Sequence, residues 1–76
     1  MYRDAESFFE SALELSPHLG EAHFDLGRAR FLAGDRAGAV AAWRRGAEQL
    51  RYNEWGRRCA ESADRADRGD PTPFGP

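Results

Sequence analysis

The chain has 76 residues, of which 41% are hydrophobic and 32% charged, and its formal net charge at pH 7 is −2. The length excludes a large buried core, because a single domain of this size buries only about 60% of its unfolded surface. No apolar run approaches the roughly 18–20 residues of a membrane span and the acidic start lacks a signal-peptide core, so we expect a cytoplasmic protein without a membrane partner.

The first predicted helix covers residues 2–15. Its apolar side chains recur at steps of three and four residues, as in an amphipathic helix: Ala5, Phe8, Phe9, Ala12, Leu13 and Leu15. Ser16 and Pro17 end this helix, because proline disfavours helical backbone in the residue before it.

The second and third helices are predicted over residues 20–33 and 36–50. Gly34 favours the left-handed backbone that ends a helix, and the Asp35 carboxylate is a good acceptor for backbone N–H groups at the next helix start. The side chains that we expect to face inward on the third helix include Val40, Trp43 and Leu50.

A fourth helix is predicted over residues 54–68, after Asn53 as its N-cap. Its apolar stripe is narrow and the rest is charged, as expected for a helix that covers the end of a repeat array. Gly69 ends it. Residues 69–76, rich in proline and glycine, are predicted to form a flexible tail after a helical domain over residues 1–68.

Shifting the chain by 34 residues places part of it on itself. Ala5, Phe9 and Ala12 fall on Ala39, Trp43 and Gly46. This period and this spacing resemble the tetratricopeptide repeat, a helix–turn–helix unit with the pattern W-x₂-L-G-x₂-Y…A-x₃-F…P. The matching residues here are His23-x₂-Leu26-Gly27-x₂-Arg30 followed by Ala39-x₃-Trp43. The resemblance implies an all-α fold of four antiparallel helices, a short right-handed solenoid fragment.

The match departs from the family at several positions. His23 and Arg30 replace aromatic residues, and Arg51 stands where a proline is usual. The fourth helix is expected not to continue the 34-residue register, because Leu26 and Gly27 would fall on Ala60 and Glu61. The first helix resembles the second helix of a unit whose first helix is missing. The chain therefore holds about one and a half repeats and a cap. We expect the uncovered face of the first helix to be a self-association or docking surface, with these candidates: Tyr2, Ala5, Phe8 and Phe9.

The resemblance also implies a concave surface that binds extended peptides. The residues placed there are Glu21, Phe24, Arg28, Phe31 and Leu32. Arg28 would bind a carboxylate while Phe24 and Phe31 hold apolar side chains. The alternative places both aromatic rings in the core and leaves Arg28 as a solvated surface residue.

Charge is unevenly distributed along the chain. Residues 1–27 carry six acids and one arginine, whereas residues 28–58 carry eight arginines and three acids. The alternatives are head-to-tail self-association, an oriented partner, or two solvated helix faces. The densest basic run is a candidate surface for an acidic partner: Arg44, Arg45, Arg51, Arg57 and Arg58. No nucleic acid is expected as a partner, because the domain is acidic overall and has no recognition motif. Arginine as the only basic residue is expected of a GC-rich bacterial genome.

The sequence contains few residues of metal-binding or catalytic type. The nitrogen and sulfur ligands are His18, His23 and Cys59, and a structural zinc site normally needs four. We interpret His23 as a partly buried substitute for an aromatic residue and Cys59, which has no disulfide partner, as a core residue of a protein in a reducing compartment. No phosphate loop or catalytic motif occurs.

We therefore expect no metal, no cofactor and no enzymatic activity. The predicted function is a protein–protein interaction module that binds a peptide or a helical partner. The alternative is a structural self-association domain, which would act as a homo-oligomer.

Overall fold

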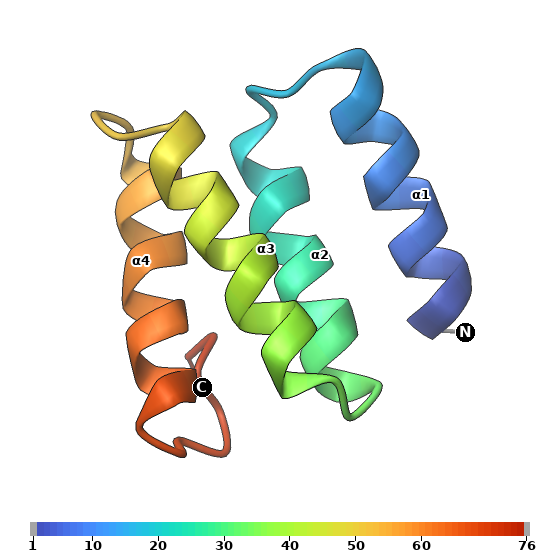
Figure 1. Cartoon of the computed structure of the whole chain (residues 1–76). Coiled ribbons are helices and arrows are strands. Elements are labelled where there is room, and N and C mark those ends of the chain that lie inside the picture. The colour runs from blue at the N-terminus through green and yellow to red at the C-terminus, as the bar shows by residue number, and fades with distance from the viewer. Residues whose placement is uncertain (1, 76) are drawn as a thin grey trace.

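The computed structural model describes residues 2–75, which form four helices joined by short loops and followed by a folded tail (Figure 1). The helices are α1 (Tyr2–Leu15), α2 (Gly20–Leu32), α3 (Arg36–Gln49) and α4 (Glu54–Asp67). Residues 2–75 contain no strand, so the prediction of an all-α fold with four helices is confirmed. The last three helices each end one residue earlier than predicted.

The helix ends follow from the capping residues that the sequence offers. The Asp35 side chain accepts a hydrogen bond of 2.8 Å from the Gly38 N–H at the start of α3, and the Asn53 side chain accepts one of 2.8 Å from the Trp55 N–H in α4. Gly34 has a φ of +91°, the left-handed backbone that glycine adopts at low cost. The predicted N-caps and the predicted helix stop at Gly34 are confirmed.

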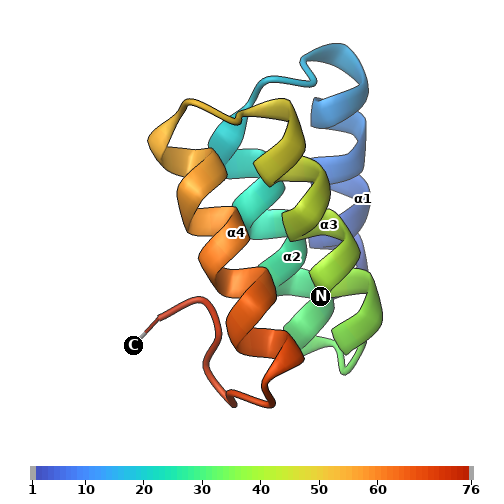
Figure 2. The ribbon, with the colours of Figure 1, turned by 60° about the vertical axis from the view of Figure 1, so that its left-hand side comes forward.

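Each helix packs against its neighbour in the chain, and α2 also contacts α4. In Figure 1, α1 lies at one edge and α4 at the other, with α2 and α3 between them, and the turned view of Figure 2 shows α2 behind α3 and α4. Within residues 2–75, α1 packs on α2 alone among the helices. The fold is therefore a short row of antiparallel helices, like a fragment of a helical repeat.

The starts of the helices recur at a constant interval. Tyr2 and Arg36, which begin α1 and α3, are 34 residues apart, and so are Gly20 and Glu54, which begin α2 and α4. This corrects the expectation that the fourth helix does not continue the 34-residue register: its residues differ from those of α2, but it begins at the repeat interval. The period therefore describes the backbone of all four helices.

The main core is built around Trp43 on α3. Its side chain is fully buried, its Nε1–H donates a 3.0 Å hydrogen bond to the Phe24 carbonyl oxygen, and its ring lies 6.5 Å from that of Phe24 and 6.3 Å from that of Phe31. The indole lies directly against the backbone of α2 at Gly27, where an added Cβ would overlap it. Gly27 is needed for this close approach of α2 and α3.

The residues after α4 fold back on the domain. Pro73 is fully buried, and the Phe74 ring meets the Phe31 ring edge-on with 5.8 Å between centroids. The turn is held by Asp70, whose carboxylate accepts a 2.9 Å hydrogen bond from the Thr72 N–H. This packing corrects the expectation of a flexible tail, because the buried Pro73 and the contact of Phe74 with Phe31 attach the tail to the helices.

Replacing Gly27 with alanine is expected to lower the free energy of unfolding by about 1–3 kcal/mol, because the new methyl group overlaps the Trp43 indole. Helix propensity alone would favour alanine here by about 1 kcal/mol, so the sign identifies the contact as the cause. Urea unfolding measures the change. In a Trp43→Leu background the same substitution should cost clearly less, and an equal cost in both backgrounds would contradict this explanation.

Candidate functional site

The attachment of α1 to α2 decides which surface stays open. A small apolar cluster joins the two helices and reaches α3; it consists of Leu13, Ala22, Leu26 and Ala42, with Phe9 packed against it. Leu13 is the only buried residue of α1 among residues 2–15. The contact is therefore concentrated near the C-terminal half of α1.

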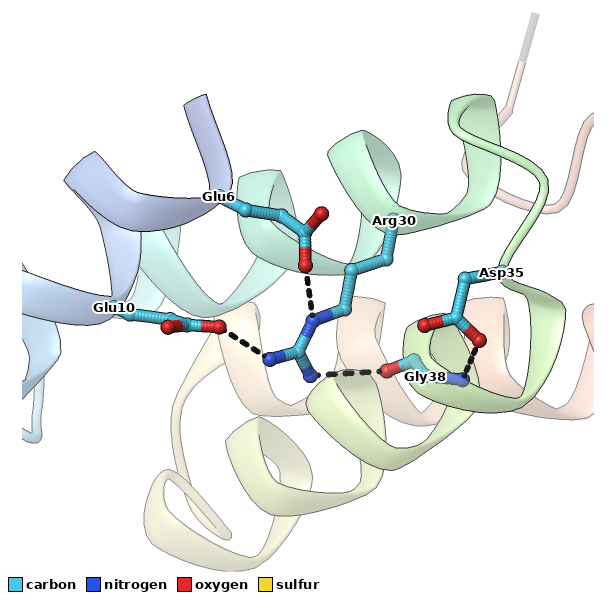
Figure 3. Close-up of polar contacts among 5 residues, drawn as sticks. All are labelled: Glu6, Glu10, Arg30, Asp35 and Gly38. Atoms are coloured by element: carbon cyan, nitrogen blue, oxygen red, sulfur yellow. Dashed lines mark hydrogen bonds and ion pairs between the residues drawn. The ribbon is translucent and has the colours of Figure 1, made fainter. Parts of the chain in front are cut away.

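A polar contact fixes the N-terminal half of α1 (Figure 3). The Arg30 Nε–H donates a 3.1 Å hydrogen bond to Glu6, its Nη2 lies 2.6 Å from the Glu10 carboxylate, and its Nη1 lies 3.3 Å from the Gly38 carbonyl oxygen. Burial disfavours the charged guanidinium, but the hydrogen bonds to Glu10 and Glu6 outweigh it and raise the pKa of Arg30. One side chain of α2 thus binds both α1 and α3.

On another side of the same helix pair lies an open groove of about 260 Å³. We call it the α1/α2 groove, and its lining residues are Phe8, Phe9, Ala12, Leu19, Glu21, Ala22 and Asp25. The lining is apolar except for the two carboxylates. Of these lining residues, Phe8 and Phe9 were expected on an open face of α1 and Glu21 on a separate peptide-binding surface. That α1 and α2 form one groove was not predicted from the sequence.

The predicted self-association residues do not all share this groove. Phe8, whose side chain is 69% exposed, lines it together with the half-buried Phe9, and the two rings meet edge-on at 5.5 Å. Tyr2 is exposed and Ala5 is half-buried, and neither lines the groove. The apolar opening is therefore centred on the middle of α1, further along the helix than the prediction placed it.

The two acids of the α1/α2 groove lie one helical turn apart on α2. Asp25 is half-buried and makes no hydrogen bond or salt bridge within residues 2–75. Burial raises the pKa of Asp25, Arg28 and Arg58 lower it, and the neighbouring Glu21 raises it further. A carboxylate in this environment is stabilised by any cation brought into the groove. The Glu21 and Asp25 spacing is visible in the sequence, but its environment is not.

The predicted peptide-binding residues are divided between different surfaces. Phe24 is buried between Trp43 and Trp55 in the core, and Phe31 is half-buried beneath Phe74. Arg28 and Leu32 are exposed, whereas Glu21 lines the α1/α2 groove. The continuous concave surface expected over these five residues is corrected, because α4 and the tail cover its aromatic part.

A second hollow of about 250 Å³ lies between α2, α4 and the tail. Phe24 and Phe74 contribute apolar surface, and the rest is polar side chains of α4. The Arg58 guanidinium stacks over the Phe24 ring at 4.9 Å and over the Trp55 ring at 4.7 Å. This arginine already has aromatic partners within the domain.

The predicted basic run does not form one patch. Arg44 pairs with Asp67 and lies 3.9 Å from Asp64, while Arg58 stacks on aromatic rings. Arg51 and Arg57 line a polar hollow of about 290 Å³ at the α3–α4 loop, and Arg45 is exposed on α3. Of these five arginines, Arg51 and Arg57 line the same hollow, whereas Arg44 and Arg58 are engaged in separate contacts.

His23 and Cys59 are buried side by side near Gly46. The His23 Nε2 lies 2.8 Å from the Pro17 carbonyl oxygen, so His23 is fully rather than partly buried and holds the α1–α2 loop. Burial lowers the pKa of His23, and Arg45 and His18 lower it further against the raising effect of the Pro17 hydrogen bond. Burial raises the pKa of Cys59 to about 11, so its thiol stays protonated.

Comparison with known proteins returns nothing: no family model, curated protein or solved structure matches the chain. None of the helices within residues 2–75 has the length and apolar character to cross a membrane. The same part of the chain holds no group of three or more side chains placed to bind a metal ion.

Replacing Arg30 with alanine is expected to lower the free energy of unfolding by about 1–3 kcal/mol, because Glu6 and Glu10 lose their common partner. Arg28→Ala is the matched control, since Arg28 lies on the same helix, is exposed and has no salt bridge within residues 2–75; its effect should stay within about 0.5 kcal/mol. Urea unfolding of both variants tests this, and equal losses would show that the Arg30 contacts are not stabilising.

The stability of the domain is expected to fall as the pH drops from about 7 to about 5. The folded state keeps His23 neutral, with its pKa below the ordinary value of 6.5, so the unfolded chain takes up this proton first. Unfolding free energies across this range, for wild type and for His23→Gln, measure the effect. The glutamine variant should lose this pH dependence, whereas His18→Gln, at an exposed position, should keep it.

Proposed function

We propose that this chain is a non-catalytic protein–protein interaction module that binds a helical segment of another protein in the α1/α2 groove. The observation that carries the proposal is the apolar opening between α1 and α2, with Phe8 69% exposed at its edge. A contiguous apolar surface left open in a small domain typically marks an interface.

The shape and chemistry of the groove favour a helix as its occupant. Its sides are two neighbouring helices, and small side chains, Ala12 and Ala22, let a third helix approach closely. An amphipathic helix that lays its apolar face into such a groove buries Phe8 and Phe9 at once. An extended strand would find no sheet edge to pair with within residues 2–75.

We also propose that the chain is a member of the tetratricopeptide-repeat class, from a bacterial cytoplasm. The 34-residue interval between helix starts supports this, together with the small residue Gly27 packed against Trp43. Proteins of this class act mainly as binding scaffolds. In such a row, a helix preceding α1 would lie in the α1/α2 groove.

Self-association is the second candidate function. Tyr2 is 48% and Phe8 is 69% exposed on the same helix, and charge of opposite sign is concentrated in residues 1–27 and 28–58. A head-to-tail contact between copies would satisfy both features. Sedimentation equilibrium at increasing concentration distinguishes it, because only this function requires an oligomer that Phe8→Glu dissociates.

The proposed function is tested by selecting helical peptides on the full chain. A display library of amphipathic helices with randomised apolar positions should yield binders whose affinity is lost in Ala12→Arg, because the long side chain fills the α1/α2 groove. Fluorescence anisotropy measures the affinities, and circular dichroism checks that the variant is folded.

Ala41→Arg is the matched control, since Ala41 is exposed on α3 and does not line the groove. It should bind the selected helices as the wild type does. Absence of any binder, or equal binding by Ala12→Arg and the wild type, would overturn the proposal.

A further inference from the structure

The chain contains a second surface that is equivalent to the open groove by the 34-residue interval, and a helix of the chain itself covers this second surface. Four residues of α3 and α4 lie 34 positions after four residues that line the α1/α2 groove; we call them the α3/α4 surface, and they are Trp43, Gly46, Trp55 and Cys59. Their counterparts in the groove are Phe9, Ala12, Glu21 and Asp25. The α3/α4 surface is covered by α2, so α2 serves as a template for the missing occupant.

The contacts of α2 define what this template offers. Gly27 lies against Trp43, and an added Cβ there would overlap the indole. Phe24 lies between the two tryptophan rings, 6.5 Å from Trp43 and 5.8 Å from Trp55, and belongs to the same cluster as Cys59. The occupant of the α1/α2 groove should likewise carry a small residue over Phe9. The residue of the occupant helix that corresponds to Phe24 then faces Phe9, Glu21 and Asp25.

The two surfaces differ in charge at one position, which is the place on the α3/α4 surface that Phe24 contacts and the corresponding place in the α1/α2 groove. Trp55 and Cys59 make this point apolar in the α3/α4 surface, whereas Glu21 and Asp25 make it acidic in the α1/α2 groove. Asp25 is half-buried without a hydrogen bond or salt bridge inside residues 2–75. An arginine or lysine there would lay its stem on Phe9 and its charged end on the two carboxylates.

We propose that the partner of the α1/α2 groove is a basic amphipathic helix with a small residue over Phe9 and, three residues earlier, an arginine or lysine that binds Glu21 and Asp25. This inference rests on the proposed function and adds the chemistry of the partner. The helix runs antiparallel to α1 and parallel to α2, as α2 runs relative to α3 and α4 (Figure 1).

A second copy of this chain that docks through its own α1 fits the groove less well than such a partner. Helix α1 is itself acidic, because it carries Asp4, Glu6, Glu10 and Glu14 against one arginine. Two copies that meet through their α1 helices would bring like charges together. The charge of the groove therefore favours a partner of opposite sign.

The test uses helix-stabilised 13-residue peptides with the sequence of α2 and with arginine, glutamine or glutamate at the place of Phe24. The arginine peptide is expected to bind the full chain about tenfold more tightly than the glutamate peptide, with glutamine between them. The difference should shrink at high salt, since charge attraction is screened. Fluorescence anisotropy at low and high NaCl measures it.

Variants of the protein separate charge from shape. Glu21→Gln with Asp25→Asn should remove the preference for arginine, and Glu21→Lys with Asp25→Lys should reverse it. Glu48→Gln with Glu61→Gln changes the net charge equally at exposed positions outside the groove, so it should keep the preference. The Asn variant also removes a half-buried carboxylate whose pKa is raised by burial, so its stability at neutral pH should not fall.

Two results would overturn this inference and leave the proposed function standing. One is equal binding of the arginine and glutamate peptides, with both blocked by Ala12→Arg. The other is failure of these peptides while unrelated helices from the library bind in the groove. Failure of every helix, library and designed, would overturn the proposed function itself.

Discussion

The indole of Trp43 packs against the backbone of α2 at Gly27, and the arrangement of the other elements follows from this contact. It sets the distance between α2 and α3, and the hydrogen bond from Nε1 to the Phe24 carbonyl oxygen fixes the ring. A buried tryptophan ring also needs apolar side chains packed around the rest of its surface. Helix α4 supplies part of this cover through Cys59 and Ala63, which are both fully buried, so three helices close around one side chain.

Helix α1 stands outside this arrangement. Its counterpart of Trp43 is Phe9, a smaller and half-buried ring that packs against the small cluster around Leu13 and against Phe8. Because α2 is the only helix within residues 2–75 that packs on α1, the charged contact of Arg30 with Glu6 and Glu10 has to hold the N-terminal half of α1. Charged pairs that are partly exposed stabilise less than a buried ring. The same feature that weakens the attachment of α1 leaves the α1/α2 groove open.

The helices were predictable because their signals are local. Gly34, Asp35 and Asn53 act on backbone groups within three residues, and the structure places all three as expected. The partners of Arg30 lie 20 and 24 residues away in the chain, so no spacing rule identified them. The groove was predicted only in part, for the same reason. The sequence spacing shows that Phe8 and Phe9 lie on an apolar face of α1, but it does not show that α2 forms the other side of the groove and supplies its two acids.

The proposed function gives a physical reason for the carboxylates of the α1/α2 groove, where the equivalent α3/α4 surface is apolar. The α3/α4 surface binds a helix of its own chain, so it uses Trp55 and Cys59 and gains stability from apolar burial. At the same places the groove has Glu21 and Asp25, which add nothing to the core and cost some stability through the burial of Asp25. Acids at an open apolar surface disfavour contact with another acidic helix and reward a basic one. Under the proposed function, the two acids would disfavour the acidic α1 of another copy, and the apolar lining would still bind a basic helix.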